Sequence, residues 1–488
     1  MRIAVIGAGV GGLAAACLLA GKGHEVTVCE QAPAVGGKLG WREIDGVGFD
    51  TGPSLLTLPH ILREVFEQAG GWPESLVLQR LEPIARYRFA DGSGFDVSSD
   101  LDTFCAALDA WAPGSGHDWR RFMSHASRLW QAVRGPFLES ELRGPSTLVE
   151  LALRRPRDLA TIAPWRTLAD LGQRYLRDPR LRAFLWRYAT YTGSDPRRVP
   201  AALATIAFAE QHYGGWYVRG GLRLIAAELA ARAIDLGAEI RLGTEVIGVV
   251  TAGERAGGVH LSSGERLGAD AVVCNADAAQ LYAELLPGSI GRAGRQQLSR
   301  VSPSYSGFAL LLAIRGSRPA DLAHHTVLFP ADYPAEFDDL AAGRPVAEPA
   351  IYLSAPVDAA LAPAGLLPMF LLVNAPRQDQ CEWTAEWSHE YAARLLDRLA
   401  TRGLDLRDRL ASCTMRTPAD LQQATRAPGG SIYGSSSNGL RAAFLRPRNR
   451  GPIPGLYLVG GSSHPGGGLP LVLRSAQIVS RMIDSGAG

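Results

Sequence analysis

The chain is poor in lysine and has no apolar run long enough to cross a membrane. Of its 50 basic residues only Lys22 and Lys38 are lysines, and the arginines are interleaved with 48 acidic residues, which leaves a net charge of +2. Such dispersed charge does not form a surface that follows phosphates, so we expect no nucleic-acid partner. The apolar runs 307–314 and 366–373 are about half the length of a bilayer-spanning helix. We therefore expect no transmembrane helix.

The six cysteines are far apart, and none stands in a CxxC pair. Their spacing encodes neither a zinc site nor a dithiol redox centre, so we expect no bound metal and a protein of the reducing cytoplasm. The adjacent His324 and His325 do not alter this expectation, because neighbouring residues on a strand point to opposite faces. Glycines interrupt the apolar N-terminus at the positions of a turn, which argues against a secretory signal peptide.

The length of 488 residues exceeds the ~250–300 residues that one hydrophobic core usually supports. Hydrophobic residues make up 47% of the chain and charged residues 20%, a composition typical of globular rather than disordered proteins. We therefore expect more than one packed unit.

The N-terminus predicts a β–α–β unit with a strand over 2–6, a helix over 11–20 and a second strand over 24–30. A glycine-rich turn in such a unit receives a dinucleotide pyrophosphate at the helix N-terminus, and an acid that ends the second strand accepts from a ribose hydroxyl. Gly9 would let the backbone approach the pyrophosphate, and Gly12 would let the helix pack against the strand. The turn consists of Gly7, Gly9, Gly11 and Gly12, and the acid is Glu30. Dinucleotide binding is thus the first functional prediction.

Two further turns extend this motif, Gly36-Gly37-Lys38 and Asp50-Thr51-Gly52-Pro53. The extended fingerprint is similar to that of FAD-binding flavoproteins of the amine-oxidase and carotenoid-desaturase superfamily. The resemblance implies FAD rather than NAD, with Gly37, Lys38, Gly52 and Pro53 beside it.

Later motifs resemble the bacterial-type phytoene and carotenoid desaturases over nearly the whole chain. They are Tyr191-Thr192-Gly193, GWYVRGG at 215–221, VVCNAD at 272–277 and GGSSHPGGGLP at 460–470. The last motif is most similar to members that act on already unsaturated or end-modified carotenoids, the hydroxycarotenoid 3,4-desaturase branch. The resemblance implies that Val246 lies near the adenine. It places along the ribityl chain and the isoalloxazine ring Gly460, Gly461, Pro465, Gly468 and Leu469.

The activity that this resemblance implies is an FAD-dependent desaturation, in which the flavin takes a hydride equivalent from an allylic carbon of a linear carotenoid. Oxygen or a quinone would reoxidise the flavin. Two alternatives stay open: a carotenoid oxygenase or isomerase on the same scaffold, and a flavin oxidase of another apolar or amine substrate. Amine oxidases of this superfamily generally use a lysine to hold a water at the flavin, and no lysine follows Lys38, which disfavours amine oxidation.

His464 is the candidate catalytic residue, because a histidine titrates near neutrality and can relay a proton. The alternative is a turn residue that fixes the loop between Ser463 and Pro465. A set of aromatic residues is similarly open, since they either line a tunnel for the polyene or pack in the core: Trp165, Phe184, Trp186, Tyr188, Tyr191, Trp216 and Tyr217.

The expected fold class is α/β, with a Rossmann-like FAD-binding domain, a mixed-sheet substrate domain and a helical insert. The FAD-binding domain would combine 1–70, most of 206–295 and 431–488, the substrate domain 71–112 and 296–430, and the insert 113–205. Strands are expected around 239–250, 258–261 and 271–274.

The insert mixes basic and apolar residues, so we expect it to attach the protein to the inner face of the cell membrane, where a polyene dissolves. An ordinary amphipathic surface is the alternative. The residues concerned are Leu151, Leu153, Arg154, Arg155, Arg157, Leu159, Ile162, Trp165 and Arg166.

Overall fold

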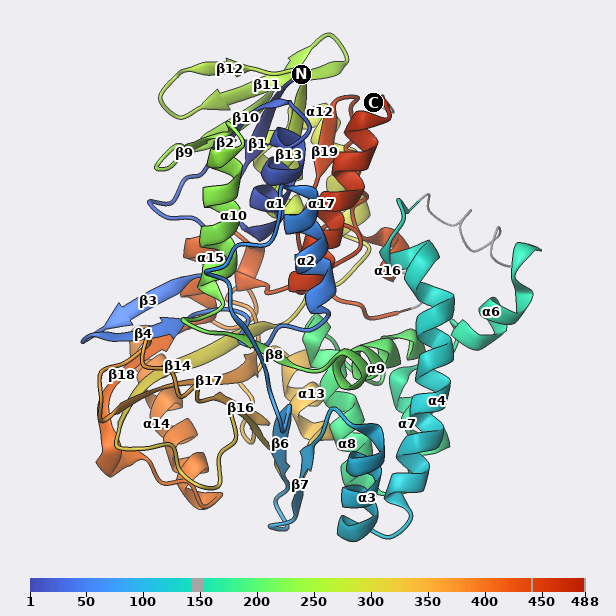
Figure 1. Ribbon diagram of the computed structural model, residues 1–488, viewed down its shortest axis with the longest axis vertical. Coiled ribbons are helices and arrows are strands. Elements are labelled where there is room, and N and C mark those ends of the chain that lie inside the picture. The colour runs from blue at the N-terminus through green and yellow to red at the C-terminus, as the bar shows by residue number, and fades with distance from the viewer. Residues whose placement is uncertain (143–152, 440–441, 487–488) are drawn as a thin grey trace.

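The structure is a computed structural model that describes residues 1–142, 153–439 and 442–486. A parallel sheet with its helices lies at the end of the molecule that carries both termini, and a larger mixed sheet and a layer of helices lie at the other end (Figure 1). This arrangement confirms the α/β fold class. Leu151, which belongs to the predicted membrane surface, falls outside the described residues.

Three distant parts of the chain build the parallel sheet. Its strand order is β19-β13-β1-β2-β9, and every neighbouring pair is parallel. The eleven residues of α1 (Val10–Ala20) are all buried between this sheet, α10 (Arg223–Asp235) and α17 (Leu469–Asp484), which explains why α1 is apolar on all sides. The strands are β1 (Arg2–Ile6), β2 (Glu25–Cys29), β9 (Glu239–Arg241), β13 (Ala271–Cys274) and β19 (Leu456–Leu458).

The predicted strand region 239–250 divides between two sheets. Its first residues form β9 of the parallel sheet, a turn with Gly243 at φ 62° follows, and the rest enters an antiparallel three-stranded sheet. That sheet consists of β10 (Val246–Ala252), β11 (Arg255–Leu261) and β12 (Arg266–Gly268). The division brings Val246, the first residue of β10, close to the end of β2, because the Thr244 N–H donates to the Glu30 carbonyl oxygen at 2.7 Å.

The second large sheet has seven strands in the order β18-β14-β17-β16-β15-β6-β7, and it is mixed because β6 pairs with β15 in parallel. Successive residues of β14 point to opposite faces. Phe308 and Leu310 pack beneath α14 (Ala385–Thr401), whereas Ala309 and Leu311 face the hairpin β3 (Trp41–Ile44) and β4 (Val47–Asp50). The strands are β6 (Ala85–Arg88), β7 (Gly94–Val97), β14 (Ser306–Arg315), β15 (His325–Leu328), β16 (Ile351–Ser354), β17 (Leu366–Ala375) and β18 (Leu410–Arg416).

Burial on both faces explains the long apolar runs of β14 and β17, which are strands and not membrane helices. In the described ranges, no helix combines the length and the apolar character that crossing a bilayer requires.

The helical layer shares one aromatic core with the edge of the mixed sheet. Phe184 of this layer contacts Tyr87 of β6 and Phe95 of β7, with ring centroids 4.6 and 5.3 Å apart. The layer extends beyond the predicted insert 113–205 at both ends, because α3 before it and α9 at its end both pack on α4. The division of the chain into domains stays a prediction. Its helices are α3 (Leu101–Trp111), α4 (Ser115–Val133), α6 (Pro156–Ile162), α7 (Leu168–Tyr175), α8 (Pro179–Arg187) and α9 (Ala204–Tyr213).

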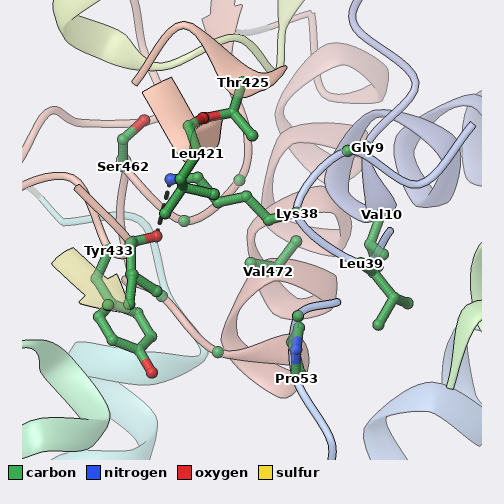
Figure 2. Close-up of a pocket in the computed structure, with 18 of the residues that line it drawn as sticks. Gly9, Val10, Lys38, Leu39, Pro53, Leu421, Thr425, Tyr433, Ser462 and Val472 are labelled. Carbon is green, nitrogen blue, oxygen red and sulfur yellow. Dashed lines mark hydrogen bonds between the residues drawn. The ribbon is translucent and has the colours of Figure 1, made fainter. Parts of the chain in front are cut away.

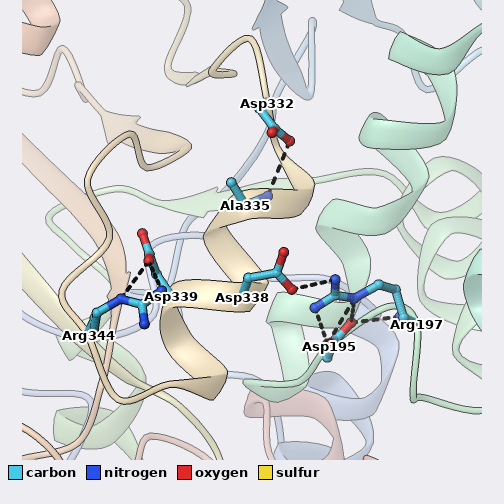
Figure 3. A network of polar contacts seen from close by, with 7 residues as sticks. All are labelled: Asp195, Arg197, Asp332, Ala335, Asp338, Asp339 and Arg344. Atoms are coloured by element: carbon cyan, nitrogen blue, oxygen red, sulfur yellow. Dashed lines mark hydrogen bonds and ion pairs between the residues drawn. The ribbon is translucent and has the colours of Figure 1, made fainter.

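Ion pairs also join the helical layer to the mixed-sheet domain (Figure 3). Arg197 lies 2.8 Å from Asp195 and 2.7 Å from Asp338 of α13 (Pro334–Ala341). The Arg197 side chain is partly exposed and that of Asp338 is largely exposed. A pair of this kind contributes only ~0–1 kcal/mol to the free energy of unfolding, so it orients the two units more than it stabilises them.

The remaining elements connect these units. A short two-stranded sheet joins the chain before β6 to the chain after α9. These elements are α2 (Pro59–Gln68), β5 (Leu78–Arg80), β8 (Trp216–Val218), α11 (Ala278–Gln280), α12 (Gly288–Leu298), α15 (Pro418–Thr425) and α16 (Ala442–Leu445).

Candidate functional site

A cavity of about 440 Å³ extends from the carboxyl ends of β1 and β2 to the inner face of the mixed sheet. Its volume lies within the ~300–1,000 Å³ range of small-molecule sites. Ile6 and Glu30 border one end, and Phe370 and Leu372 of β17 border the other. Figure 2 shows part of its wall, with Gly9 and Val10 on one side and Tyr433 and Ser462 on the other. The cavity therefore bridges the two sheets.

The glycine turn after β1 takes the conformation that the motif predicts. Gly7 has φ 92°, a value that L side chains rarely adopt. A Cβ built on Gly12 would lie 2.1 Å from the Gly7 carbonyl oxygen, so Gly12 permits the close packing of α1 on the turn but does not line the cavity. Gly9, Val10 and Gly11 do line it. The N-terminus of α1, with its free N–H groups, therefore faces the cavity, as an anion site requires.

Glu30 is held rigidly at the end of β2. One carboxylate oxygen accepts from the Ala8 N–H at 2.7 Å, and the other accepts from the Ala32 N–H at 2.8 Å. The side chain is 8% exposed and borders the cavity. Each oxygen can accept a further bond, so Glu30 fixes the glycine turn and still offers acceptors to a ligand.

A second glycine segment lies directly opposite the first. A Cβ on Gly11 would lie 3.1 Å from the Gly460 Cα, which requires both residues to be small. Gly461, Gly468 and Leu469 also line the cavity, and Leu469 begins α17. The cavity thus receives the N-termini of two helices, α1 and α17.

Lys38 ties the N-terminal segment to the C-terminal part of the chain (Figure 2). Its ammonium donates to the carbonyl oxygens of Ser431 at 2.9 Å and of Ile432 at 2.8 Å. Burial lowers the pKa of Lys38 from its ordinary value. Gly37, Lys38, Gly52, Pro53 and Val246 all line the cavity; their position beside a cofactor stays a prediction.

His464 does not border the cavity, and neither does Pro465. The His464 Nε2 lies 2.9 Å from the Ser140 carbonyl oxygen, and the side chain is 3% exposed. Burial lowers the pKa of His464 to about 4, so the ring is neutral near pH 7. Its backbone oxygen accepts from Asn449 and Ser475. This geometry favours the role of a turn residue over that of a proton relay.

The sequence motifs left Asn275 without an assigned role. A Cβ on Gly9 would lie 2.6 Å from its Nδ2, and a Cβ on Gly11 would lie 2.6 Å from its Oδ1. Asn275 directly follows β13, which pairs with β1 in parallel. The carboxyl ends of neighbouring parallel strands meet at one edge of the sheet. The VVCNAD motif therefore contained the signal that could have predicted Asn275 beside the glycine turn.

Most of the aromatic residues considered for a tunnel pack elsewhere. Only Tyr191 among them borders the cavity. Phe184, Tyr188 and Tyr217 are buried in the hydrophobic cores, and Trp165 is 64% exposed. The residues that do border the mixed-sheet end were not found from the sequence, since they come from segments that only the fold brings together. They include Ser54, Arg187, Thr190, Tyr305, Tyr352 and Tyr433.

Comparison with known proteins agrees with this geometry. The family described as flavin containing amine oxidoreductase matches residues 10–327. The chain is 36% identical to a 4,4'-diapolycopene oxygenase of a Methylomonas species, over 98% of this chain and 97% of that protein. It is 34% identical to the hydroxyneurosporene desaturase of Rhodobacter capsulatus, over 99% of this chain and 97% of that protein. It is 33% identical to a zeta-carotene-forming phytoene desaturase of Myxococcus xanthus, over 99% of this chain and 93% of that protein.

Among solved structures, a putrescine oxidase triple mutant superposes with a TM-score of 0.69 at 16% identity, covering 99% of this chain and 98% of that one. A fatty acid isomerase from P. acnes superposes with a TM-score of 0.62 at 15% identity, covering 98% of each chain. At these identities the likeness shows the fold alone.

Proposed function

Because the chain belongs to the flavin containing amine oxidoreductase family and to its carotenoid desaturases and oxygenases, we propose that it is an FAD-dependent desaturase. It introduces carbon–carbon double bonds into a linear carotenoid in carotenoid biosynthesis. One observation supports this most directly. One cavity connects the glycine-walled end beside Glu30 with an end formed by the mixed sheet, where Ala309, Phe370 and Leu372 make an apolar face.

The glycine-walled end suits FAD in shape and in donor chemistry. The N–H groups at the start of α1 hold the pyrophosphate, Glu30 accepts from the adenosine ribose, and Val246 lies beside the adenine. Bound FAD supplies the acceptor for a hydride equivalent. Gly12 and Pro465 act through backbone packing, since neither borders the cavity. The residues along the rest of the cofactor are Gly37, Lys38, Gly52, Pro53, Gly460, Gly461, Gly468 and Leu469.

The mixed-sheet end suits a polyene because one face of its wall is apolar. Ala309 of β14 and Phe370 and Leu372 of β17 present one face of the sheet to the cavity, and Leu55 and Ile432 add to it. These residues exclude water from the reacting carbons and hold the chain against the glycine segment. Of the 488 residues no lysine follows Lys38, so the chain lacks the residue expected for amine oxidation.

An oxygenase is the second candidate, because the relative at 36% identity is a 4,4'-diapolycopene oxygenase. The same cavity serves both reactions, so only the product distinguishes them. The electron acceptor of the reduced flavin is oxygen or a quinone.

We assign the membrane contact to the region of α6, which lies at the periphery of the molecule (Figure 1). Leu153 is 80% and Trp165 is 64% exposed, and the exposed Arg155 and Arg157 lie between them in the sequence. Exposed apolar residues beside arginines suit the surface of an anionic membrane. Ile162 is buried instead, and it packs against α4. On this proposal the protein is peripheral and lies on the inner face of the cell membrane.

The test is incubation of the purified, FAD-loaded protein with defined linear carotenoids and an electron acceptor, followed by chromatography and mass spectrometry. Desaturation removes two hydrogens per double bond, whereas oxygenation adds oxygen. Products that contain new oxygen, or an unchanged carotenoid under conditions in which the flavin turns over on another substrate, would refute the proposal.

A further inference from the structure

Arg187 places a positive charge at the mixed-sheet end of the cavity. It is the last residue of α8, and it borders the cavity together with Thr190 and Tyr191. The guanidinium lies 5.6 Å from the ring centre of Tyr191 and 5.7 Å from that of Tyr352. Arg416 also borders the cavity, but its guanidinium donates to the Thr51 carbonyl oxygen.

No described residue neutralises this charge by an ion pair. Two buried carboxylates act on Arg187 from a distance, but both are bound to other donors. Glu210 accepts from the hydroxyls of Tyr188 and Tyr191 at 2.8 and 2.9 Å. Glu336 accepts from the Ala350 N–H and the Asn374 amide, each at 2.7 Å. Arg197, ten residues later in the chain, differs from Arg187 because it forms ion pairs with Asp195 and Asp338.

The hydrogen bonds of Arg187 are also incomplete. A guanidinium has five N–H donors. Among the described residues its side chain donates to the Thr190 hydroxyl alone. The Tyr352 hydroxyl is already bound to Ser54 at 2.5 Å and to His325 at 2.7 Å. Free donors on a partly buried cation are unfavourable unless another acceptor meets them, and Arg187 borders the cavity.

The chain just after Arg187 lies near Tyr433, and Tyr433 in turn lies near the C-terminal glycine segment. A Cβ on Gly193 would lie 3.0 Å from the Tyr305 nitrogen and 3.2 Å from the Tyr433 ring. A Cβ on Gly467 would lie 2.5 Å from the same Tyr433 ring. The Tyr433 ring thus lies beside both Gly193, six residues after Arg187, and Gly467 of the glycine segment proposed to face the flavin.

We propose that Arg187 is a specificity-determining residue that binds a hydrogen-bond-accepting oxygen, a carbonyl or a carboxylate, at the leading end of the polyene. The assignment rests on the proposed function of the same cavity. The apolar wall holds the hydrocarbon chain, the guanidinium holds its oxygenated end, and the length between them sets which carbon–carbon bond reaches the flavin. The substrate class is a polyene with an oxygenated end, so a reaction that installs the oxygen must precede this one.

The test compares three linear polyenes of equal length that end in a carboxylate, in an aldehyde or in a hydrocarbon. Binding to the FAD-loaded wild type, Arg187→Met and Arg187→Lys is measured by quenching of tryptophan fluorescence. Arg182→Met is the matched control, because Arg182 lies on the same helix and does not border the cavity. FAD content and thermal melting establish that each variant is folded.

Arg187→Met should weaken binding of an oxygenated polyene by about 10- to 100-fold and leave binding of the hydrocarbon unchanged, since a charge-assisted hydrogen bond is lost. Arg187→Lys should weaken binding of the oxygenated polyene less, because lysine keeps the charge but lacks the planar fork of the guanidinium. If Arg187→Met does not fold, the comparison of Arg187→Lys with the wild type replaces it. An effect on the aldehyde alone or on the carboxylate alone identifies the end group. Equal weakening for all three polyenes, or for none, would overturn the assignment. Wild-type protein that binds the polyenes selectively but desaturates none would instead refute the proposed function.

Discussion

Gly9→Val should remove FAD binding with little damage to the fold. Gly9 has φ −70°, which any residue adopts, so the backbone tolerates a side chain there. A Cβ at this position would lie 2.6 Å from the Asn275 Nδ2, closer than real Cβ contacts. That neighbour is the end of a flexible side chain and can rotate away. The two methyl groups of valine, however, would occupy the cavity wall at the N-terminus of α1.

The expected magnitude follows from the required approach. A phosphate oxygen must lie ~2.9 Å from a backbone nitrogen to accept its hydrogen, and a methyl group in that path prevents the contact. Loss of the helix N-terminal contacts should weaken FAD binding by at least ~100-fold, which corresponds to ~2.7 kcal/mol. Wild-type protein at an FAD concentration ~100 times its Kd should gain a similar free energy of unfolding, and the variant should gain almost none.

The assay combines flavin absorbance after desalting, titration calorimetry of the apoprotein and melting curves with and without FAD. Gly288→Val is the matched control, because Gly288 is exposed and a Cβ there has no neighbour within 4 Å. The control should bind FAD as the wild type does. A folded Gly9→Val protein with wild-type FAD content would refute the assignment of the pyrophosphate to this turn.

Three further outcomes follow from the same geometry. His464→Ala should keep the turnover rate within about twofold and leave the pH profile unchanged near neutrality, because the ring faces away from the cavity and burial lowers its pKa to about 4; a loss of ~10²-fold in steady-state kinetics would restore it as a base. Gly467→Leu should retain FAD but lose polyene turnover, since even a Cβ there meets the Tyr433 ring at 2.5 Å; product analysis at equal flavin content decides, and undiminished turnover would contradict it. Leu153→Glu with Trp165→Glu should release the protein from anionic vesicles in a flotation assay while FAD stays bound; equal flotation of wild type and variant would place the membrane contact elsewhere.

Local sequence pattern determined the glycine-walled end of the cavity, to which we assign FAD. The strand predicted over 2–6 is β1, and the helix predicted over 11–20 begins one residue earlier as α1. Gly9 and Glu30 border the cavity because a β–α–β unit brings the turn and the end of its second strand to one edge of the sheet. The family resemblance extended this to Val246 and the glycines at 460–468, which lie far away in the sequence.

The tertiary structure alone decided where side chains point and which distant segments meet. His464 lies three residues from the cavity-lining Gly461 and Gly467, yet its ring turns toward Ser140. The 239–250 region divides between two sheets because β9 pairs with β2 whereas β10 pairs with β11. Arg187 lies in a sequence rich in arginine, and only packing shows that it faces the cavity without an ion pair while Arg197 is paired. The type of a residue, which the sequence gives, limits its chemistry. Its partners come from distant segments, and the positions of those segments are set only when the whole hydrophobic core packs.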